Sequence, residues 1–442
     1  MKQNNFLPPA VALCLGLLLF WSLPAVSQGV VDRDEVTLSD DSVSIDADGL
    51  NAIVSAPAAP MLTHAQVIAE RVRALMHDPL FNRTQVGLCI YDLTDDSLVY
   101  AYHWRYRLRP ASNMKIITAV TALDLLGPDY MYRTTLLTDY EPDTVFVRLN
   151  DSTVARSVVL PGNLYVHGGF DPVLGDADVR RLISALTSRG ISEIRGNVVL
   201  DYSMKDENRK GWGWCWDDED PPLVSLLYNG KDEFASAFFA RLNAAGVRLG
   251  GRIMGDVTPD TAQVFYQLER PISEVMERMM KASDNLYAES MFYQLAAQCG
   301  PRGVGRVEGA AMVDSLVERL GLDHTVYEFA DGSGLSLYNY ATPELLLTLL
   351  RYAYSEPDIY DALLPTLPVA GRDGTLNKRM KGTAAEGNVQ AKTGTVTGVS
   401  TLSGYCTASN GHRLAFSIMN NGLRNSAQGR AFQDRVCVAL CK

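Results

Sequence analysis

Three short stretches of the sequence contain side chains that could together form a nucleophilic site. Ser112 precedes Lys115 by three positions, and the chain also contains Ser283-Asp-Asn285 and Lys392-Thr-Gly394. Residues i and i+3 of a helix are neighbours, so the Ser112 hydroxyl and the Lys115 amine would share one face. A lysine is a useful base only if burial or nearby positive charge lowers its pKa. The spacing therefore predicts a serine nucleophile activated by a lysine, which needs no histidine.

The third stretch lies in a run of alternating residues, 389–397, that predicts a β-strand. The Lys392 ammonium would point to one face of this strand, where it could hold a carboxylate. Gly394 would leave space for a substrate backbone along the strand edge, and the amide of Thr395 could help to form an oxyanion hole. Each stretch alone is common in proteins, and a helix cap followed by a solvated lysine explains most Ser-x-x-Lys pairs. All three in this order indicate a Ser/Lys/Ser acyl-transfer site.

The elements that must position these residues come from both ends of the chain. Amphipathic spacing predicts a helix after Thr63, and a second helix running to Leu126 would hold Ser112 and Lys115 in its first turn. Alternation predicts strands over 86–90, 98–102, 388–397, 399–406 and 412–419, with a closing helix after them. The expected fold class is mixed α+β: an antiparallel five-stranded sheet flanked by helices, with a helical subdomain and an inserted domain.

Changes in composition divide the chain into regions. We expect a signal peptide at 1–27, a flexible acidic tether at 28–62, a catalytic domain formed by 63–130 and 266–442, and inserted material at 131–265. The apolar run near the start is short for a membrane span, so cleavage is favoured over a retained anchor. The protein is then exported to the periplasm or another extracytoplasmic compartment, and no membrane association is expected after cleavage.

Overall composition limits the classes of function. The formal net charge is −11, which argues against nucleic acid as a partner because phosphate binding needs clustered Lys and Arg. The six histidines are scattered and no Cys-x-x-Cys occurs, so we expect no metal and no cofactor. The cysteines are too few for a dense disulfide framework, and buried free thiols are expected for most of them.

The motifs and their flanking residues resemble a known family. Ala111-Ser-Asn-Met-Lys115, Ser283-Asp-Asn-Leu-Tyr-Ala-Glu289, Asp331-Gly-Ser-Gly-Leu-Ser336 and Lys392-Thr-Gly-Thr395 are similar to signatures of the class C low-molecular-mass penicillin-binding proteins. These are D-alanyl-D-alanine carboxypeptidases and endopeptidases within the serine penicillin-recognising enzymes. The resemblance implies a β-lactamase/transpeptidase-like domain, and the long separation of Ser112 from Ser283 resembles the inserted domain of class C.

The resemblance also implies roles for the site residues. Ser112 would attack the carbonyl between two D-alanines at the end of a peptidoglycan peptide, and it would also react with β-lactam antibiotics. Ser283 would relay a proton to the leaving amine, and Asn285 would orient the substrate amide. Lys392 and Thr393 would bind the terminal carboxylate, and the amides of Ser112 and Thr395 would hold the oxyanion. Lys115 is the expected base, although the sequence leaves open which lysine has that role.

An aromatic and acidic stretch, Trp212-Gly-Trp-Cys-Trp-Asp-Asp-Glu-Asp220, allows two interpretations. It could be a hydrophobic strand that runs into a solvated acidic loop. In the family that it resembles, a similar segment lines the cleft and contacts the ammonium group of a diamino-acid side chain, a role that would fall to Asp217 or Asp218.

Two other functions fit parts of the pattern. A β-lactamase-like hydrolase would use the same nucleophile, but we find no Glu-x-x-x-Asn loop placed after the second motif. A non-catalytic wall-binding protein could keep the fold, but it would not need Ser112, Lys115, Ser283, Asn285 and Lys392 together. The sequence therefore favours a serine-type D-Ala-D-Ala carboxypeptidase, with endopeptidase activity left open.

Overall fold

The computed structural model describes residues 62–148 and 150–442. The predicted signal peptide, 1–27, and all of the predicted tether except its last residue lie outside this part of the chain. The described residues form one compact unit.

A five-stranded antiparallel sheet joins the two ends of the catalytic region, as predicted. In spatial order its strands are β12 (Gln390–Val396), β13 (Val399–Thr407), β14 (Arg413–Asn421), β1 (Gln85–Asp92) and β2 (Ser97–Tyr102). Because β12 is an edge strand, one side of the Lys392-Thr-Gly stretch is not paired within the sheet. The mixed α+β class is confirmed.

Helices cover both faces of this sheet. Alternate residues of β1 point to opposite faces. Leu88 and Ile90 share one hydrophobic cluster with α1 (His64–Leu75) and α10 (Ser426–Cys441), whereas Cys89 and Tyr91 share another with α8 (Pro343–Ser355). The first turn of α1 is fixed by a capping box, in which the Thr63 side chain accepts from the Gln66 amide and the Gln66 side chain accepts from the Thr63 amide.

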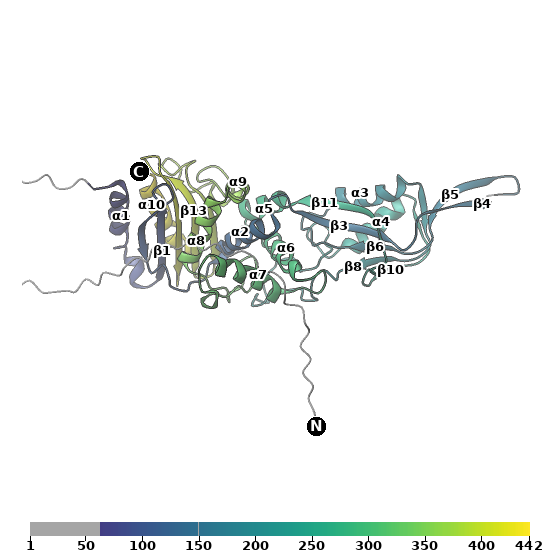
Figure 1. Cartoon of the computed structure of the whole chain (residues 1–442), viewed down its shortest axis with the longest axis horizontal. Helices are drawn as coiled ribbons and strands as arrows, with labels where there is room; N and C mark the ends of the chain where they lie inside the picture. The colour runs from purple at the N-terminus through teal and green to yellow at the C-terminus, as the bar shows by residue number, and fades with distance from the viewer. Residues whose placement is uncertain (1–61, 149) are drawn as a thin grey trace, which may run out of the picture. The chain divides into compact units, whose positions relative to one another are not determined.

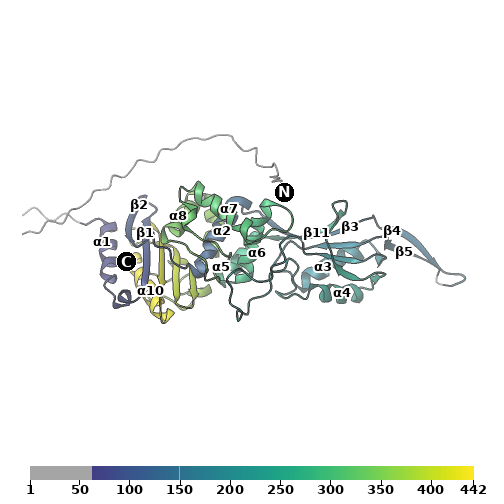
Figure 2. The ribbon, with the colours of Figure 1, turned by 90° about the horizontal axis from the view of Figure 1, so that it is seen from below.

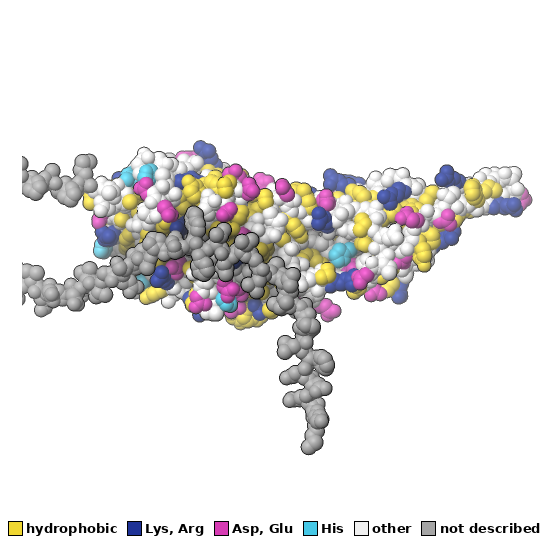
Figure 3. Space-filling model, viewed as in Figure 1, with side chains coloured by type: hydrophobic (Ala, Val, Ile, Leu, Met, Phe, Trp, Pro, Cys, Tyr) yellow, Lys and Arg dark blue, Asp and Glu magenta, His cyan; other side chains and the backbone are white. Residues whose placement is uncertain are grey.

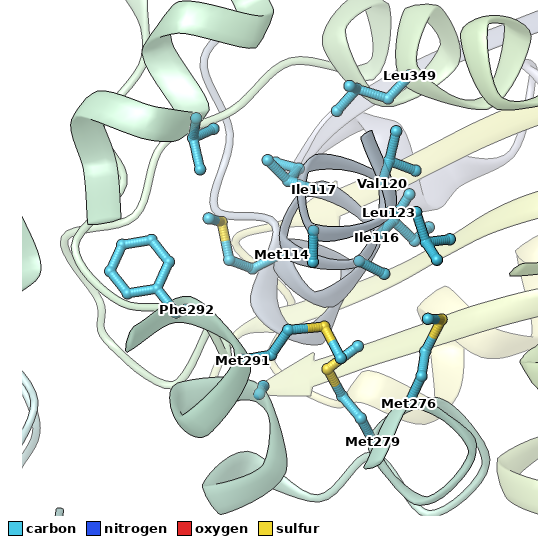
Figure 4. Close-up of a cluster of buried hydrophobic side chains, with 14 of the residues drawn as sticks. Met114, Ile116, Ile117, Val120, Leu123, Met276, Met279, Met291, Phe292 and Leu349 are labelled. Carbon is cyan, nitrogen blue, oxygen red and sulfur yellow. The ribbon is translucent and has the colours of Figure 1, made fainter. Parts of the chain in front are cut away.

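The helical subdomain is built around α2 (Met114–Leu126). Residues 114–123 of this helix are all buried, as expected of a helix that is apolar on every side. Its neighbours are α8 and, on its other sides, α5 (Ile272–Lys281), α6 (Asn285–Ala296), α7 (Arg306–Arg319) and α9 (Pro357–Leu363). Figure 4 shows side chains of α2 packed among Met276 and Met279 of α5 and Met291 and Phe292 of α6. This packing fixes the helix that follows the proposed nucleophile.

The middle of the chain forms two further sheets. One has the order β10 (Ile253–Gly255), β8 (Val198–Asp201), β6 (Leu164–His167), β3 (Met131–Thr138) and β11 (Gln263–Pro271), and the other has the order β4 (Asp143–Arg148), β5 (Val154–Leu160), β7 (Ile191–Ile194) and β9 (Arg248–Leu249). Helices α3 (Asp176–Thr187) and α4 (Phe234–Ala244) pack on the first of these sheets (Figure 2). Figure 1 shows α5, α6 and α7 between this region and the five-stranded sheet.

The chain enters and leaves the middle region through neighbouring antiparallel strands. Met131 at the start of β3 pairs with Pro271 at the end of β11. A boundary at 265/266 would fall inside β11, so we propose that the insert extends from 131 to 271.

The face drawn in Figure 3 has no large basic area over the described residues. Lys and Arg side chains are interspersed there with Asp and Glu. Within residues 62–148 and 150–442, no helix combines the length and apolar character that crossing a membrane requires.

Candidate active site

The proposed nucleophile lies in a tight turn directly before α2. Ser112 is the central residue of the 3₁₀ turn Ala111–Asn113 and is half-buried. The preceding residue, Ala111, has a φ of 46°, a left-handed conformation that costs a non-glycine residue free energy. Ser112 thus precedes α2, whereas the sequence predicted that it lies in the first turn of the helix, but the turn still sets Ser112 Oγ 3.1 Å from Lys115 Nζ.

Lys115 is buried and its amine contacts three acceptors. The side chain is fully buried, and Nζ lies 2.8 Å from Asn285 Oδ1 and 2.8 Å from the Ser333 carbonyl, in addition to Ser112. Burial lowers the pKa of Lys115 to about 8, although the carboxylates of Asp331, Glu289, Asp284 and Asp220 oppose the shift. Such a pKa allows the neutral amine to accept the Ser112 proton at mildly alkaline pH.

This pKa predicts the pH dependence of acylation. Protonated Lys115 cannot accept a proton, so the rate constant for reaction with penicillin should fall about tenfold per pH unit below the lysine pKa. We expect an acid limb with an inflection near pH 8, measured as fluorescent-penicillin labelling rates from pH 5 to 10. A labelling rate that is still rising tenfold per pH unit at pH 10, as an ordinary lysine would give, would show that Lys115 is not a buried base.

The Ser283-Asp-Asn285 and Lys392-Thr-Gly394 motifs contact each other through Ser283 and Lys392. Lys392 Nζ donates to Ser283 Oγ at 2.8 Å and to the Thr393 carbonyl at 2.8 Å. Lys392 is fully buried, and burial together with the charge of Lys115 lowers its pKa well below the usual range. Ser283 has a φ of 62°, so the serine is held in a strained conformation just before α6 begins at Asn285. The structure thus joins Ser112, Lys115 and Asn285 to one another, and Lys392 to Ser283.

Gly394 is needed for close packing against the turn that holds the nucleophile, a reason that the sequence did not suggest. A Cβ at this position would lie 2.2 Å from Thr401 Oγ1, 2.9 Å from the Pro110 carbonyl oxygen and 2.9 Å from the Ser112 nitrogen. The missing side chain therefore faces the turn that holds the nucleophile, and it permits β12 to pack against that turn. Thr395, one residue later, is exposed, and Thr393 Oγ1 donates to Thr375 Oγ1 at 2.7 Å.

Two acidic residues near Lys115 organise the loop that supplies the Ser333 carbonyl. The Asp331 carboxylate is buried and accepts from the amides of Gly334 and Ser336, at 2.7 Å each. Glu289 accepts from the Ser333 amide at 2.9 Å, and burial raises its pKa to about 8. Both residues lie in motifs that resemble the family, but the sequence alone indicated no role for them in the site.

The aromatic and acidic stretch does not form the strand that one interpretation proposed; residues 212–220 are turns and loop. Asp217 is exposed, and Asp218 accepts from the Cys215 amide at 2.7 Å, which closes a local turn. The carboxylate that contacts a site residue is that of Asp220, whose Oδ1 accepts from Asn285 Nδ2 at 2.9 Å. Asp220 was missed because its partner lies 65 positions away in the sequence.

One group of residues has the donor types of a metal site. Ligand atoms of Asp92, Asp95 and His412 lie within 4.8 Å of one another, and His412 Nδ1 is 2.8 Å from Asp92 Oδ2. The three residues lie at the ends of β1 and β14, outside the Ser112 site, and the histidine already pairs with Asp92. All six cysteines of the described residues are free thiols, and Cys89, Cys406, Cys437 and Cys441 are buried.

Comparison with known proteins agrees with the motifs. A sequence profile described as the D-Ala-D-Ala carboxypeptidase 3 (S13) family matches residues 68–227 and 222–440. A D-alanyl-D-alanine carboxypeptidase from an Actinomadura species is 27% identical, and the match covers 85% of this chain and 84% of that protein.

Solved structures share the fold. The crystal structure of penicillin-binding protein 4 (DacB) from Haemophilus influenzae matches with a TM-score of 0.70 and 22% identity, covering 86% of this chain and 98% of that one. The same protein has been solved with a bound β-lactam. A penicillin G-acylated predatory endopeptidase from Bdellovibrio bacteriovorus matches with a TM-score of 0.52 and 17% identity, covering 80% of this chain and 91% of that one.

Proposed function

Because this chain belongs to the D-Ala-D-Ala carboxypeptidase 3 (S13) family of serine-type peptidases, we propose that it removes the terminal D-alanine of peptidoglycan stem peptides through an acyl-enzyme on Ser112. The observation that supports these site assignments most strongly is the position of the Lys115 amine. It is fully buried and lies between Ser112 Oγ at 3.1 Å and Asn285 Oδ1 at 2.8 Å.

The first step is acylation. Neutral Lys115 accepts the Ser112 proton while Oγ bonds to the carbonyl carbon of the penultimate D-alanine. The oxyanion is held by the amides of Ser112 and Thr395. The carbon–nitrogen bond then breaks, and the proton that Lys115 accepted reaches the leaving D-alanine nitrogen through Ser283, which Lys392 holds at 2.8 Å, so that Lys115 is neutral again. Water next attacks the ester carbonyl and loses a proton to the neutral Lys115 amine, which passes it to Oγ as the bond between Oγ and the carbonyl carbon breaks, and the shortened peptide leaves.

Substrate binding uses the edge of the five-stranded sheet. An extended peptide can lie along β12, as peptides do on exposed sheet edges. Asn285 orients the substrate amide, and Lys392 and Thr393 bind its terminal carboxylate. Asp217 or Asp218 remains a proposed contact for a side-chain ammonium group. Cross-linked peptides are a second proposed substrate, since an endopeptidase shares the fold, and the β-lactam complex of a structural relative supports β-lactams as covalent ligands.

We also propose that the protein works outside the cytoplasm, because peptidoglycan is there and the first 27 residues resemble a signal peptide. Incubation with purified muropeptides tests the activity. Release of free D-alanine from pentapeptides, blocked by prior penicillin treatment, is the expected result, and splitting of cross-links would add endopeptidase activity. If the muropeptides stay intact although the same enzyme preparation is labelled by penicillin, the proposed reaction is contradicted.

The β-lactamase alternative makes a different prediction. A β-lactamase must hydrolyse its acyl-enzyme rapidly, so it would turn over nitrocefin repeatedly. We expect instead a stable penicilloyl adduct, with no more than a stoichiometric burst of nitrocefin hydrolysis. A wall-binding protein without catalysis would form neither an adduct nor products.

Lys392→Gln tests carboxylate recognition. The substitution removes a charge-assisted hydrogen bond worth about 1.5–3 kcal/mol, which corresponds to about 10–150-fold in rate. The loss should be large for D-Ala-D-Ala peptides and penicillin, and smaller for a thioester that lacks the carboxylate, because Ser112 and Lys115 remain. Equal losses on both substrates would instead assign Lys392 to the proton relay through Ser283.

A further inference from the structure

A segment of the insert reaches the catalytic centre and is held at both of its ends. We call residues 212–220 the strap. Near its start, Trp214 Nε1 donates to the buried Asp331 carboxylate at 2.9 Å, and the Trp212 ring packs 4.9 Å from the Tyr338 ring. At its far end, Asp220 accepts from Asn285 Nδ2 at 2.9 Å. The insert therefore contributes a carboxylate directly to a residue of the site.

The contact with Asp220 determines which way the Asn285 amide faces. An asparagine side chain has an acceptor oxygen and a donor nitrogen that can exchange places by rotation. Here Oδ1 accepts from Lys115 Nζ at 2.8 Å and Nδ2 donates to Asp220. With the amide reversed, a donor would face the lysine and an acceptor would face a carboxylate, and both contacts would be unfavourable. One hydrogen of Nδ2 stays available for a substrate carbonyl.

No cation lies within ion-pair distance of Asp220 among the described residues, although Lys231 and Arg278 line the same cavity. Asp220 lines a cavity of about 1010 Å³ together with Asp284, Arg278 and Tyr287. Arg278 pairs with Asp284 at 2.9 Å, and in residues 62–148 and 150–442 no ion pair includes Asp220. Its negative charge therefore acts on the buried Lys115 amine, whose pKa it raises.

We propose that Asp220 is a positioning residue for acylation, which fixes the Asn285 amide and stabilises the protonated form of Lys115 across it. This role rests on one part of the proposed function, namely that Lys115 and Asn285 take part in the acylation of Ser112. It assigns to the strap a role in the acylation of every substrate, including those without a diamino-acid side chain.

The electrostatic part has a definite sign. Four carboxylates, those of Asp331, Glu289, Asp284 and Asp220, raise the pKa of Lys115 against the larger effect of burial. The other charged group of the site that faces it is Lys392, on β12. Removing the Asp220 charge should therefore lower the pKa of Lys115 further. The acid limb of acylation would then move to lower pH, because the neutral amine persists there.

Two variants of the full chain separate position from charge. Asp220→Asn keeps the shape and an acceptor oxygen but loses the charge, so we expect the acid limb of penicillin labelling to move down by about 0.5 pH unit or more. Asp220→Ala also removes the contact that orients Asn285, so the labelling rate on the alkaline plateau should fall about 10-fold to 100-fold. Asp220→Glu keeps the carboxylate and should retain the wild-type acid limb.

Glu219→Gln is the matched control. Glu219 is the exposed neighbour of Asp220 in the sequence and lines the same cavity. The substitution also removes one negative charge, as Asp220→Asn does. It should leave both the plateau and the acid limb unchanged. Two results together would overturn the proposal. The pH profile of Asp220→Asn would superimpose on the profiles of wild type and Glu219→Gln, and the plateau rate of Asp220→Ala would equal that of wild type. Absence of labelling in the wild-type protein would be a failure of the proposed function instead.

Discussion

Ser112→Ala should abolish covalent labelling by fluorescent penicillin and the release of D-alanine. No other hydroxyl of the site has the same access to Lys115, since Ser283 Oγ pairs with Lys392 instead. Loss of the nucleophile in a serine enzyme costs about 10⁴-fold or more in rate, so no adduct should form on the time scale of wild-type labelling.

The variant should remain folded, which makes the result interpretable. The Lys115 amine keeps two of its three acceptors, Asn285 Oδ1 and the Ser333 carbonyl, when the Ser112 hydroxyl is removed. Thermal unfolding followed by circular dichroism provides the control. Labelling of folded Ser112→Ala at the wild-type rate would place the nucleophile at another residue.

Lys115→Met should lower the acylation rate by about 10²–10⁴-fold, the usual contribution of a positioned general base. Methionine fills similar space in the core around α2 but cannot accept a proton. The acid limb near pH 8 should disappear with the lysine, which a purely structural change would not cause. The substitution leaves Asn285 Oδ1 and the Ser333 carbonyl without their donor, which costs stability, so circular dichroism must show a folded variant before its rate is compared with wild type.

Lys205→Met is the matched control for this substitution. Lys205 is also nearly fully buried, and burial lowers its pKa, but its amine bonds to Asp206 and the Asn208 carbonyl within the insert. Its loss should leave the acylation rate and its pH profile unchanged. An equal fall in both variants would mean that Lys115 acts through stability and not as the base.

Sequence periodicity was sufficient to predict the elements that hold the motifs. The alternation in 388–397, 399–406 and 412–419 corresponds to β12, β13 and β14, and the amphipathic run after Thr63 corresponds to α1. These features are local, because burial on one face imposes a period of 2 or 3.6 residues. Proximity of Ser112 to Lys115 follows from the same geometry, with both residues close to the start of one helix.

Contacts between distant segments could not be predicted in this way. Asn285 and Lys115 are 170 positions apart, and only the resemblance to a family placed them together. Neither periodicity nor resemblance indicated Asp220, because a loop residue leaves no pattern and the family comparison directed attention to Asp217 and Asp218. The packing role of Gly394 was likewise not predictable, because the Ser112 turn that occupies the space beside it comes from a distant part of the sequence.

The acyl-enzyme itself is the most direct test of this account. The full chain would be incubated with penicillin, digested, and analysed by mass spectrometry to locate the adduct. We expect one penicilloyl group per chain, bonded to Ser112 and absent after competition with a D-Ala-D-Ala peptide. A penicilloyl group on any other residue, or none on a folded protein, would contradict it.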